Sequence, residues 1–294
     1  MNRKKSRFLS LMLILICAAL TLTACGGAAT TTAATTTAAV TTSVPSATTA
    51  AAQKLIVGME LAYPPFEMTD TSNRPTGLSV DFAKALGQKL GREVVIENMA
   101  WAGLIPALET GKIDLIISSM TITEERKKTI DFSDPYAMAN LALLIAKDSA
   151  VSSYADLDQK GRKLAVKKGS TGHTYALANL KNAELMVFDK ESACVLEVVQ
   201  GKVDAFTYDQ LTIFRNWQEN QAKTRVNLAP YQTTPEYWGV GIKKGNDVLK
   251  TSVNGFIKEF RAQGGFDKLA ETYLTAEKKT FNELKIPFFF DVGK

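Results

Sequence analysis

The chain has 294 residues, of which 46% are hydrophobic and 22% charged, a balance typical of globular proteins that excludes wholesale disorder. Its net charge of +5 comes mainly from a basic N-terminal segment, outside which basic and acidic residues nearly balance, so a nucleic-acid binder is not expected. One histidine and three scattered cysteines exclude a two-histidine zinc motif, a thiolate cluster and a disulfide framework, so we expect no metal site and no cofactor.

Residues 1–24 have the pattern of a secretory signal peptide. A basic start is followed by an apolar run at 8–23, which is short for a helix that spans a membrane. The sequence LTAC at 22–25 resembles the lipobox of bacterial lipoproteins, in which cleavage exposes the cysteine for lipidation. We therefore expect Cys25 to carry lipid and to anchor the chain to the outer face of the cell membrane. The alternative is an ordinary signal peptide followed by a coincidental cysteine.

Residues 25–52 form the expected lipidated cysteine and a linker. Gly26–Ala52 contains ten alanines and ten threonines and no charged residue. Such a segment buries too little apolar surface to offset the entropy of ordering, so we expect it to be disordered. It would give the folded part room to reach a partner beside its anchor.

Residues 53–294 alternate β-rich runs with helical patterns. In chain order, strands are expected at 55–59, 94–99, 115–118, 141–145, 164–166, 185–188, 205–207 and 238–242. Helices are expected at 78–90, 105–109, 191–200, from 210 onward, and at 248–261. This alternation predicts an α/β fold with mostly parallel sheets. About 240 residues is large for one sheet, so two lobes with a ligand cleft between them are expected.

The segment 101–136 carries the clearest chemistry. A buried strand ends in hydroxyl-bearing residues, and Thr123 is a good N-cap for the helix that follows. Arg126 then lies in the first turn of that helix, where its positive charge opposes the helix dipole. Arg126 could pair with Asp131 or Asp134. Alternatively, it could join the hydroxyls and the free N–H groups of the helix start in an anion site suited to a carboxylate.

This segment resembles the core signature of the amino-acid-binding members of the bacterial extracellular solute-binding proteins, family 3, and the resemblance extends over nearly all of residues 54–275. The matching pieces follow the family's order: Gly58 with Glu60 and Tyr63–Glu67; Gly77-Leu78 with Asp81; Trp101–Tyr136; Gly169–Thr171; Gly201 with Val203–Ala205 and Asp209; Trp238-Gly239. The resemblance implies a two-lobe, periplasmic-binding-protein-like (type II) α/β fold with two crossover strands. It places 53–146 and 235–294 in lobe 1 and 147–234 in lobe 2.

The resemblance also implies which residues bind the α-carboxylate and α-ammonium of an amino acid. Arg126 matches the arginine that binds the carboxylate, assisted by Thr121 from the same lobe and Thr171 from the other. Ser119 and Asp209 match residues that contact the ammonium. Asp209 could instead be only the N-cap of the helix at 210, or it could do both. Such a set suits a zwitterion, because burying either charge without a partner costs several kcal/mol.

Four further positions match residues around the ligand side chain. Tyr63 and Trp101 match aromatic walls, although an isolated aromatic residue is more often part of a core. Glu60 matches an acid at the far end of the side chain, and Lys167 matches a lysine of glutamine-binding relatives. Whether Lys167 faces the cleft or is a solvated surface charge stays open. Glutamine would satisfy both charges, arginine or lysine is favoured if Lys167 points away, and cystine and glutamate stay open.

The expected function is that of a monomeric binding lipoprotein, not an enzyme. It would capture a free polar amino acid by lobe closure and deliver it to the permease of an ABC importer with its ATPase. The alternatives are a dehydratase-like enzyme on the same scaffold, which would need an acid or base above its substrate, and an amino-acid sensor with a separate signalling partner. Cys194 is expected to be a buried thiol, and the aromatic segment 286–290 is expected to pack on the first lobe.

Overall fold

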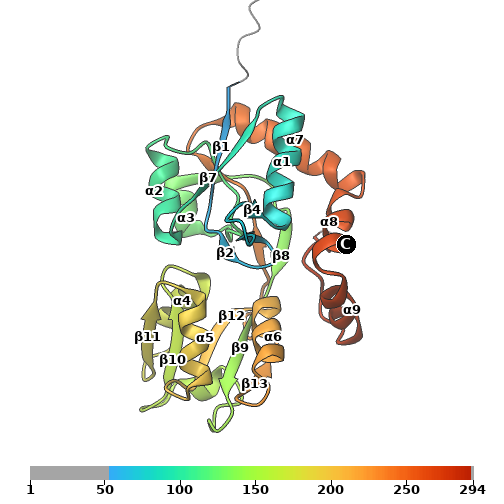
Figure 1. Ribbon diagram of the computed structural model, residues 1–294. Coiled ribbons are helices and arrows are strands. Elements are labelled where there is room, and N and C mark those ends of the chain that lie inside the picture. The colour runs from blue at the N-terminus through green and yellow to red at the C-terminus, as the bar shows by residue number, and fades with distance from the viewer. Residues whose placement is uncertain (1–52, 293–294) are drawn as a thin grey trace, which may run out of the picture. The chain divides into compact units, whose positions relative to one another are not determined.

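The computed structural model describes residues 53–292, which fall within one compact unit of the chain (Figure 1). The predicted signal peptide, the predicted lipidation site at Cys25 and the predicted linker lie outside these residues. Within 53–292, no helix is both long enough and apolar enough to cross a membrane.

The first five-stranded sheet has the order β5-β1-β6-β15-β7. Its strands are β1 (Leu55–Met59), β5 (Val94–Asn98), β6 (Leu115–Ile116), β7 (Ile130–Phe132) and β15 (Gly241–Lys243). β1 runs parallel to β5 and β6, whereas β15 runs antiparallel to β6 and β7. Helix α2 (Leu104–Glu109) packs against this sheet, and α1 (Leu78–Leu90) packs on β5. Helices α7 (Asp247–Ala262) and α8 (Gly265–Tyr273) in turn pack on α1.

Helix α1 shows why these elements form where they do. Leu78, Phe82 and Leu86 recur every four residues and are all buried, so the helix presents one apolar face to the core. It ends at Gly91, whose φ of 64° is left-handed and suits glycine.

The second five-stranded sheet has the order β11-β10-β12-β9-β13. Its strands are β9 (Leu141–Ala146), β10 (Lys163–Lys167), β11 (Glu184–Phe188), β12 (Ala205–Asp209) and β13 (Thr224–Asn227). Helix α4 (Thr171–Asn179) packs with one set of buried residues of this sheet, and α5 (Glu191–Val199) and α6 (Gln210–Glu219) pack with another. Cys194 of α5 is fully buried and free, as predicted.

Two crossover strands join the sheets. β8 (Ala137–Ala139) leads from the first sheet into β9, and β14 (Glu236–Trp238) leads back to β15; the two strands pair antiparallel. Figure 1 shows this link between the two groups of strands. The two-lobe α/β fold is therefore confirmed. β9 belongs to the second sheet, ahead of the expected lobe boundary between residues 146 and 147.

The remaining described elements are short or lie near the C-terminus. They are β2 (Ala62–Tyr63), β3 (Glu67–Thr69), β4 (Pro75–Thr76), α3 (Glu124–Thr129), α9 (Thr275–Glu283) and two 3₁₀ turns, η1 (Trp101–Gly103) and η2 (Ala155–Leu157). The segment after α9 packs on the first lobe as expected, since the ring centre of Phe289 lies 5.2 Å from that of Trp238 and 5.3 Å from that of Phe66.

Helix α9 makes a contact that the sequence did not predict. The ring centre of Phe281 in α9 lies 6.2 Å from that of Phe214 in α6, which belongs to the second lobe.

Two predicted strands differ from the structure. The strand expected at 238–242 is divided between β14 and β15, because the chain passes from the crossover into the first sheet there. The strand expected at 115–118 ends at Ile116, and the chain turns at Ser119, whose φ is 50°. Each five-stranded sheet is also mixed, since a strand entered from a crossover runs antiparallel to its neighbours.

Candidate functional site

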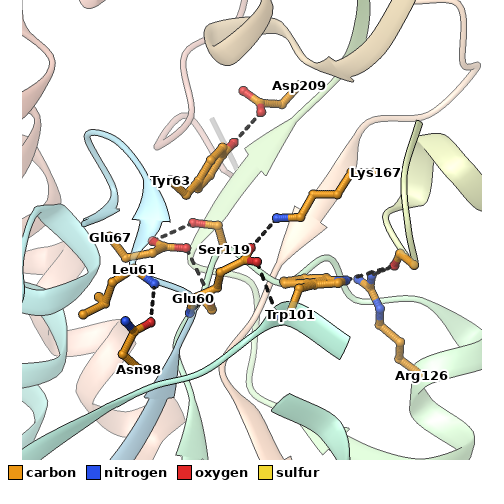
Figure 2. A network of polar contacts seen from close by, with 12 residues as sticks. Glu60, Leu61, Tyr63, Glu67, Asn98, Trp101, Ser119, Arg126, Lys167 and Asp209 are labelled. Carbon is orange, nitrogen blue, oxygen red and sulfur yellow. Dashed lines mark hydrogen bonds and ion pairs between the residues drawn. The ribbon is translucent and has the colours of Figure 1, made fainter. Parts of the chain in front are cut away.

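All nine residues assigned a binding role from the sequence line one cleft. Its wall contains seven further residues to which the sequence analysis gave no binding role: Glu67, Ser118, Leu141, Ser170, Tyr208, Glu236 and Trp238. Figure 2 shows how side chains from both lobes converge on this space.

Arg126 is oriented by the start of α3. The Thr123 hydroxyl caps this helix by accepting a hydrogen bond from the backbone N–H of Arg126 (3.2 Å), as predicted. The guanidinium donates to the backbone carbonyl oxygens of Thr121 (2.6 Å) and Gly169 (3.1 Å). The alternative pairing with Asp131 or Asp134 is wrong, because Arg126 forms an ion pair with neither in the described part of the chain, and Asp131 pairs with Lys244 instead. Burial lowers the pKa of Arg126 to about 10, and the nearby Glu236 opposes this shift.

Trp101 and Arg126 meet at the same carbonyl of the second lobe. The indole Nε1 donates to the oxygen of Gly169 (3.2 Å), and the guanidinium lies 5.2 Å from the centre of the Trp101 ring. The φ of Gly169 is 71°, in the left-handed region, so glycine permits the turn that presents this carbonyl.

Lys167 faces the cleft and forms an ion pair with Glu60, which settles the orientation that the sequence left open. The two side chains are only 4% and 13% exposed. Glu60 also accepts from the backbone N–H of Trp101 (3.3 Å), and the lysine ammonium lies 5.4 Å from the centre of the Trp101 ring. This end of the cleft thus carries one positive and one negative charge in contact (Figure 2).

Asp209 has the N-cap role that its sequence position allowed, and its second oxygen lies at the cleft. It caps α6 by accepting from the N–H of Thr212 (3.0 Å), and its other oxygen accepts from the hydroxyl of Tyr63 at the cleft. Burial raises the pKa of Asp209, although these hydrogen bonds oppose the shift. Tyr63 comes from the first lobe, so this contact also crosses between lobes.

Glu67 is a buried acid that received no binding role from the sequence. It accepts hydrogen bonds from the hydroxyls of Ser118 (3.3 Å) and Ser119 (3.1 Å), two residues at the end of β6. Burial raises its pKa to about 8. Ser119, expected to contact a ligand ammonium, is thus held by Glu67. Glu67 lies within the Tyr63–Glu67 piece that carried the family resemblance, but no side-chain contact was assigned to it there.

Glu236 is a second unassigned acid, and it contacts both threonines expected to bind a carboxylate. Its Oε2 atom accepts from the hydroxyls of Thr121 (3.1 Å) and Thr171 (2.7 Å). Burial is the largest effect on Glu236 and raises its pKa. No local pattern could have revealed it, because it lies on a three-residue strand more than 60 residues from either threonine.

Aromatic residues complete the wall of the cleft. The ring centre of Tyr63 lies 5.7 Å from that of Tyr208 and 6.2 Å from that of Trp238, both in edge-on geometry, so one face of the cleft is built from edge-on rings. Among residues 53–292, no group of histidine, cysteine, aspartate and glutamate side chains is arranged to hold a metal ion.

Comparison with known proteins agrees with this geometry. The model of the bacterial extracellular solute-binding proteins, family 3, matches residues 55–276. The chain belongs to this family. Among its relatives, the L-arginine-binding protein of Pseudomonas aeruginosa is 33% identical over 226 residues, which cover 74% of this chain and 87% of the relative. The L-cystine-binding protein of Escherichia coli (strain K12) is 29% identical over 223 residues, covering 76% and 83%.

This solute-binding protein is also similar to a solved structure. The ancestral amino-acid-binding protein AncCDT-1, described as a precursor of cyclohexadienyl dehydratase, is 37% identical and has a TM-score of 0.69. The similarity covers 76% of this chain and 96% of the ancestral one. Family membership expected from the sequence is thus confirmed, and these two relatives are binding proteins rather than enzymes. The match ends at residue 276, so most of α9 and the segment after it lie beyond it.

Proposed function

We propose that this solute-binding protein captures L-glutamine in the cleft and delivers it to an ABC importer. The observation that carries the choice of ligand is the nearly buried ion pair of Glu60 and Lys167 that lines the cleft. Its relatives are named for arginine and cystine, so relatedness alone does not select among amino acids.

The amino-acid backbone would be recognised by the charges of the cleft. The planar guanidinium of Arg126 suits a carboxylate, because its fork binds two oxygens. The hydroxyls of Thr121 and Thr171 would add neutral donors from both lobes. Asp209 would accept the ammonium in place of the Tyr63 hydroxyl. A zwitterion then has a partner for each charge, which avoids the cost of burying an unpaired ion.

The ligand side chain would be selected by Glu60 and Lys167, whose opposite charges cancel to a net charge of zero. A cationic side chain would meet the ammonium of Lys167, and an anionic one would meet the carboxylate of Glu60. An amide offers an N–H donor to Glu60 and a carbonyl acceptor to Lys167, so it satisfies both without adding a buried charge. This favours glutamine over arginine and lysine, which the sequence alone left open.

Lobe closure would follow from the placement of these groups. Glu60, Arg126 and Tyr63 belong to the first lobe, whereas Lys167, Thr171 and Asp209 belong to the second. A ligand that contacts both sets binds the closed arrangement more tightly than an open one. That difference in affinity is what allows a ligand to shift a conformational equilibrium.

Calorimetric titration of the chain with the twenty amino acids and ornithine tests the proposal. The protein is first unfolded and refolded to remove carried-over ligand. We expect glutamine to bind with micromolar or tighter affinity, about −8 kcal/mol, and arginine and lysine to bind at least tenfold more weakly. Preference for arginine would contradict the role given to Lys167, and no binding of any amino acid would contradict the proposed function.

A dehydratase-like activity is the second candidate, favoured by the similarity to AncCDT-1. The acid best placed for it is Glu67, whose pKa of about 8 keeps it protonated at neutral pH. Its carboxyl is held by serine hydroxyls in the wall, which supports a structural role instead. Mass spectrometry of the bound compound before and after long incubation distinguishes the two, since an enzyme would convert it.

We further propose that the protein is a monomer anchored by lipid on Cys25 at the outer face of the cell membrane. The LTAC sequence and the uncharged linker support this placement. Replacing Cys25 with serine should release the protein into the soluble fraction, and retention in the membrane would argue for another anchor. Sedimentation of the purified protein would show whether it is monomeric.

A further inference from the structure

Glu236 accepts hydrogen bonds from two hydroxyl groups that the proposed function assigns to the ligand. Its Oε2 atom accepts from the hydroxyls of Thr121 and Thr171, at 3.1 Å and 2.7 Å. The positive charge of Arg126 also acts favourably on this carboxylate. A carboxylate of the protein itself therefore occupies the surroundings expected to bind the carboxylate of an amino acid.

The position of Glu236 in the fold connects the two lobes through this one oxygen. Thr121 forms an isolated bridge to Trp238 beside the crossover, whereas Thr171 begins α4 in the second lobe. Glu236 itself lies on the crossover strand β14, and Gln232 donates to its other oxygen (3.3 Å). The same contact that fills the donors therefore also ties the lobes together.

Two carboxylates cannot share these donors without cost. Like charges at close range repel, and each threonine hydroxyl has a single proton to donate. A ligand carboxylate that bonds Thr121 and Thr171 must therefore displace Glu236 from them.

We propose that Glu236 competes with the ligand carboxylate for the hydroxyls of Thr121 and Thr171. Its hydrogen bonds to both threonines act as a latch that holds the two lobes closed, and the latch must be released before ligand binds. This inference rests on the proposed function for the identity of the ligand. The latched form lowers the apparent affinity in proportion to its population, because only the released form can bind. Glu236 thereby sets the concentration at which the protein responds.

Glu236→Gln removes the charge and keeps the size and an acceptor oxygen. We expect this variant to bind glutamine about 10-fold more tightly by calorimetry, since a hydrogen bond to a charged group is weakened to one with a neutral group. Glu271→Gln, at an exposed site on α8, is the matched control and should leave the affinity unchanged. Weaker binding in Glu236→Gln would overturn the proposal, because it would make Glu236 a contributor to ligand recognition.

Hydrogen–deuterium exchange of the ligand-free protein tests the latch without any ligand. Peptides covering 118–129 and 167–179 should exchange faster in Glu236→Gln than in the parent chain, because the cleft opens more often, while peptides of α1 should not change. Unchanged exchange at the cleft would overturn the latch. If no amino acid binds the parent chain, the proposed function fails while this measurement still decides whether Glu236 closes the cleft.

Discussion

Arg126 shows how a side chain can be unfavourable for its helix and suited to its site. Its charge lies in the first turn of α3, where the helix dipole opposes a cation. Among residues 53–292, its guanidinium donates to carbonyl oxygens and not to a carboxylate. A half-buried guanidinium whose hydrogen bonds go to neutral acceptors is well placed to receive an anionic ligand.

Arg126→Ala is expected to weaken glutamine binding by about 2–5 kcal/mol, because it leaves a buried ligand carboxylate without its charged partner. Calorimetric titration measures the loss. Lys127→Ala is the matched control, since Lys127 is the next residue of the same helix and is exposed. Equal affinities of the parent chain and Arg126→Ala would contradict the site assignment.

Lys167→Met is expected to change which amino acid is preferred. With the ammonium removed, Glu60 would be left unpaired and would attract a cationic side chain, so arginine should gain affinity while glutamine loses about 10-fold. Competition between the two ligands measures the switch. The exposed neighbour Lys168 provides the control as Lys168→Met. An unaltered order of affinities would show that the pair does not select the side chain.

At the scale of elements, local patterns predicted what local interactions determine. The bounds of helix α1 were predicted correctly because both signals, the spacing of its apolar residues and the Gly91 that ends it, lie within the helix or next to it in the sequence. Thr123 was predicted as a cap for the same reason. Glu236 and the pairing of β8 with β14 were not predicted, because they depend on contacts between residues about 100 positions apart. The nine site residues were found by family resemblance, which carries such long-range information.

Helix α9 extends the apolar core from the first lobe toward the second. Phe281 is buried against Phe214 of α6, and the carboxylate of Glu277 in α9 lies 3.8 Å from the guanidinium of Arg215 in α6.

Phe281→Ala should lower the free energy of unfolding by about 3–5 kcal/mol, because it leaves a cavity in this core. Urea denaturation measures the loss. Leu284→Ala, at a residue 51% exposed, should change it by less than about 0.5 kcal/mol; equal effects would show that α9 is not part of the core.

At the scale of the whole molecule, the cleft contains several acidic side chains whose burial favours the protonated form over the ionised one. Burial raises the pKa of Glu67 to about 8 and also raises the pKa values of Asp209 and Glu236. Each of these lies where two lobes or two sheets meet. The cleft is thus a region in which folding and proton binding are coupled.

Glu67 should make the protein less stable as pH rises. The folded chain keeps a proton on Glu67 up to pH about 8, whereas the unfolded chain releases it near the ordinary value of 4.5. Its contribution is therefore fully present below pH 4.5 and is lost as pH rises to 8, by roughly 3 kcal/mol between pH 5 and 8. Asp209 and Glu236 act in the same direction, and His173, whose pKa is lowered by burial, acts in the opposite one.

Glu67→Gln isolates that contribution, because the amide is neutral at every pH; its oxygen can accept from one serine hydroxyl while its NH2 group donates to the other. Urea denaturation at pH 5, 6.5 and 8 should show a flatter dependence in Glu67→Gln than in the parent chain, with the two curves converging or crossing as pH rises. The exposed Glu93 offers a control, since Glu93→Gln should keep the parent slope. If Glu67→Gln also keeps that slope, Glu67 is ionised in the folded protein, and the serines at the end of β6 bind a carboxylate rather than a neutral acid.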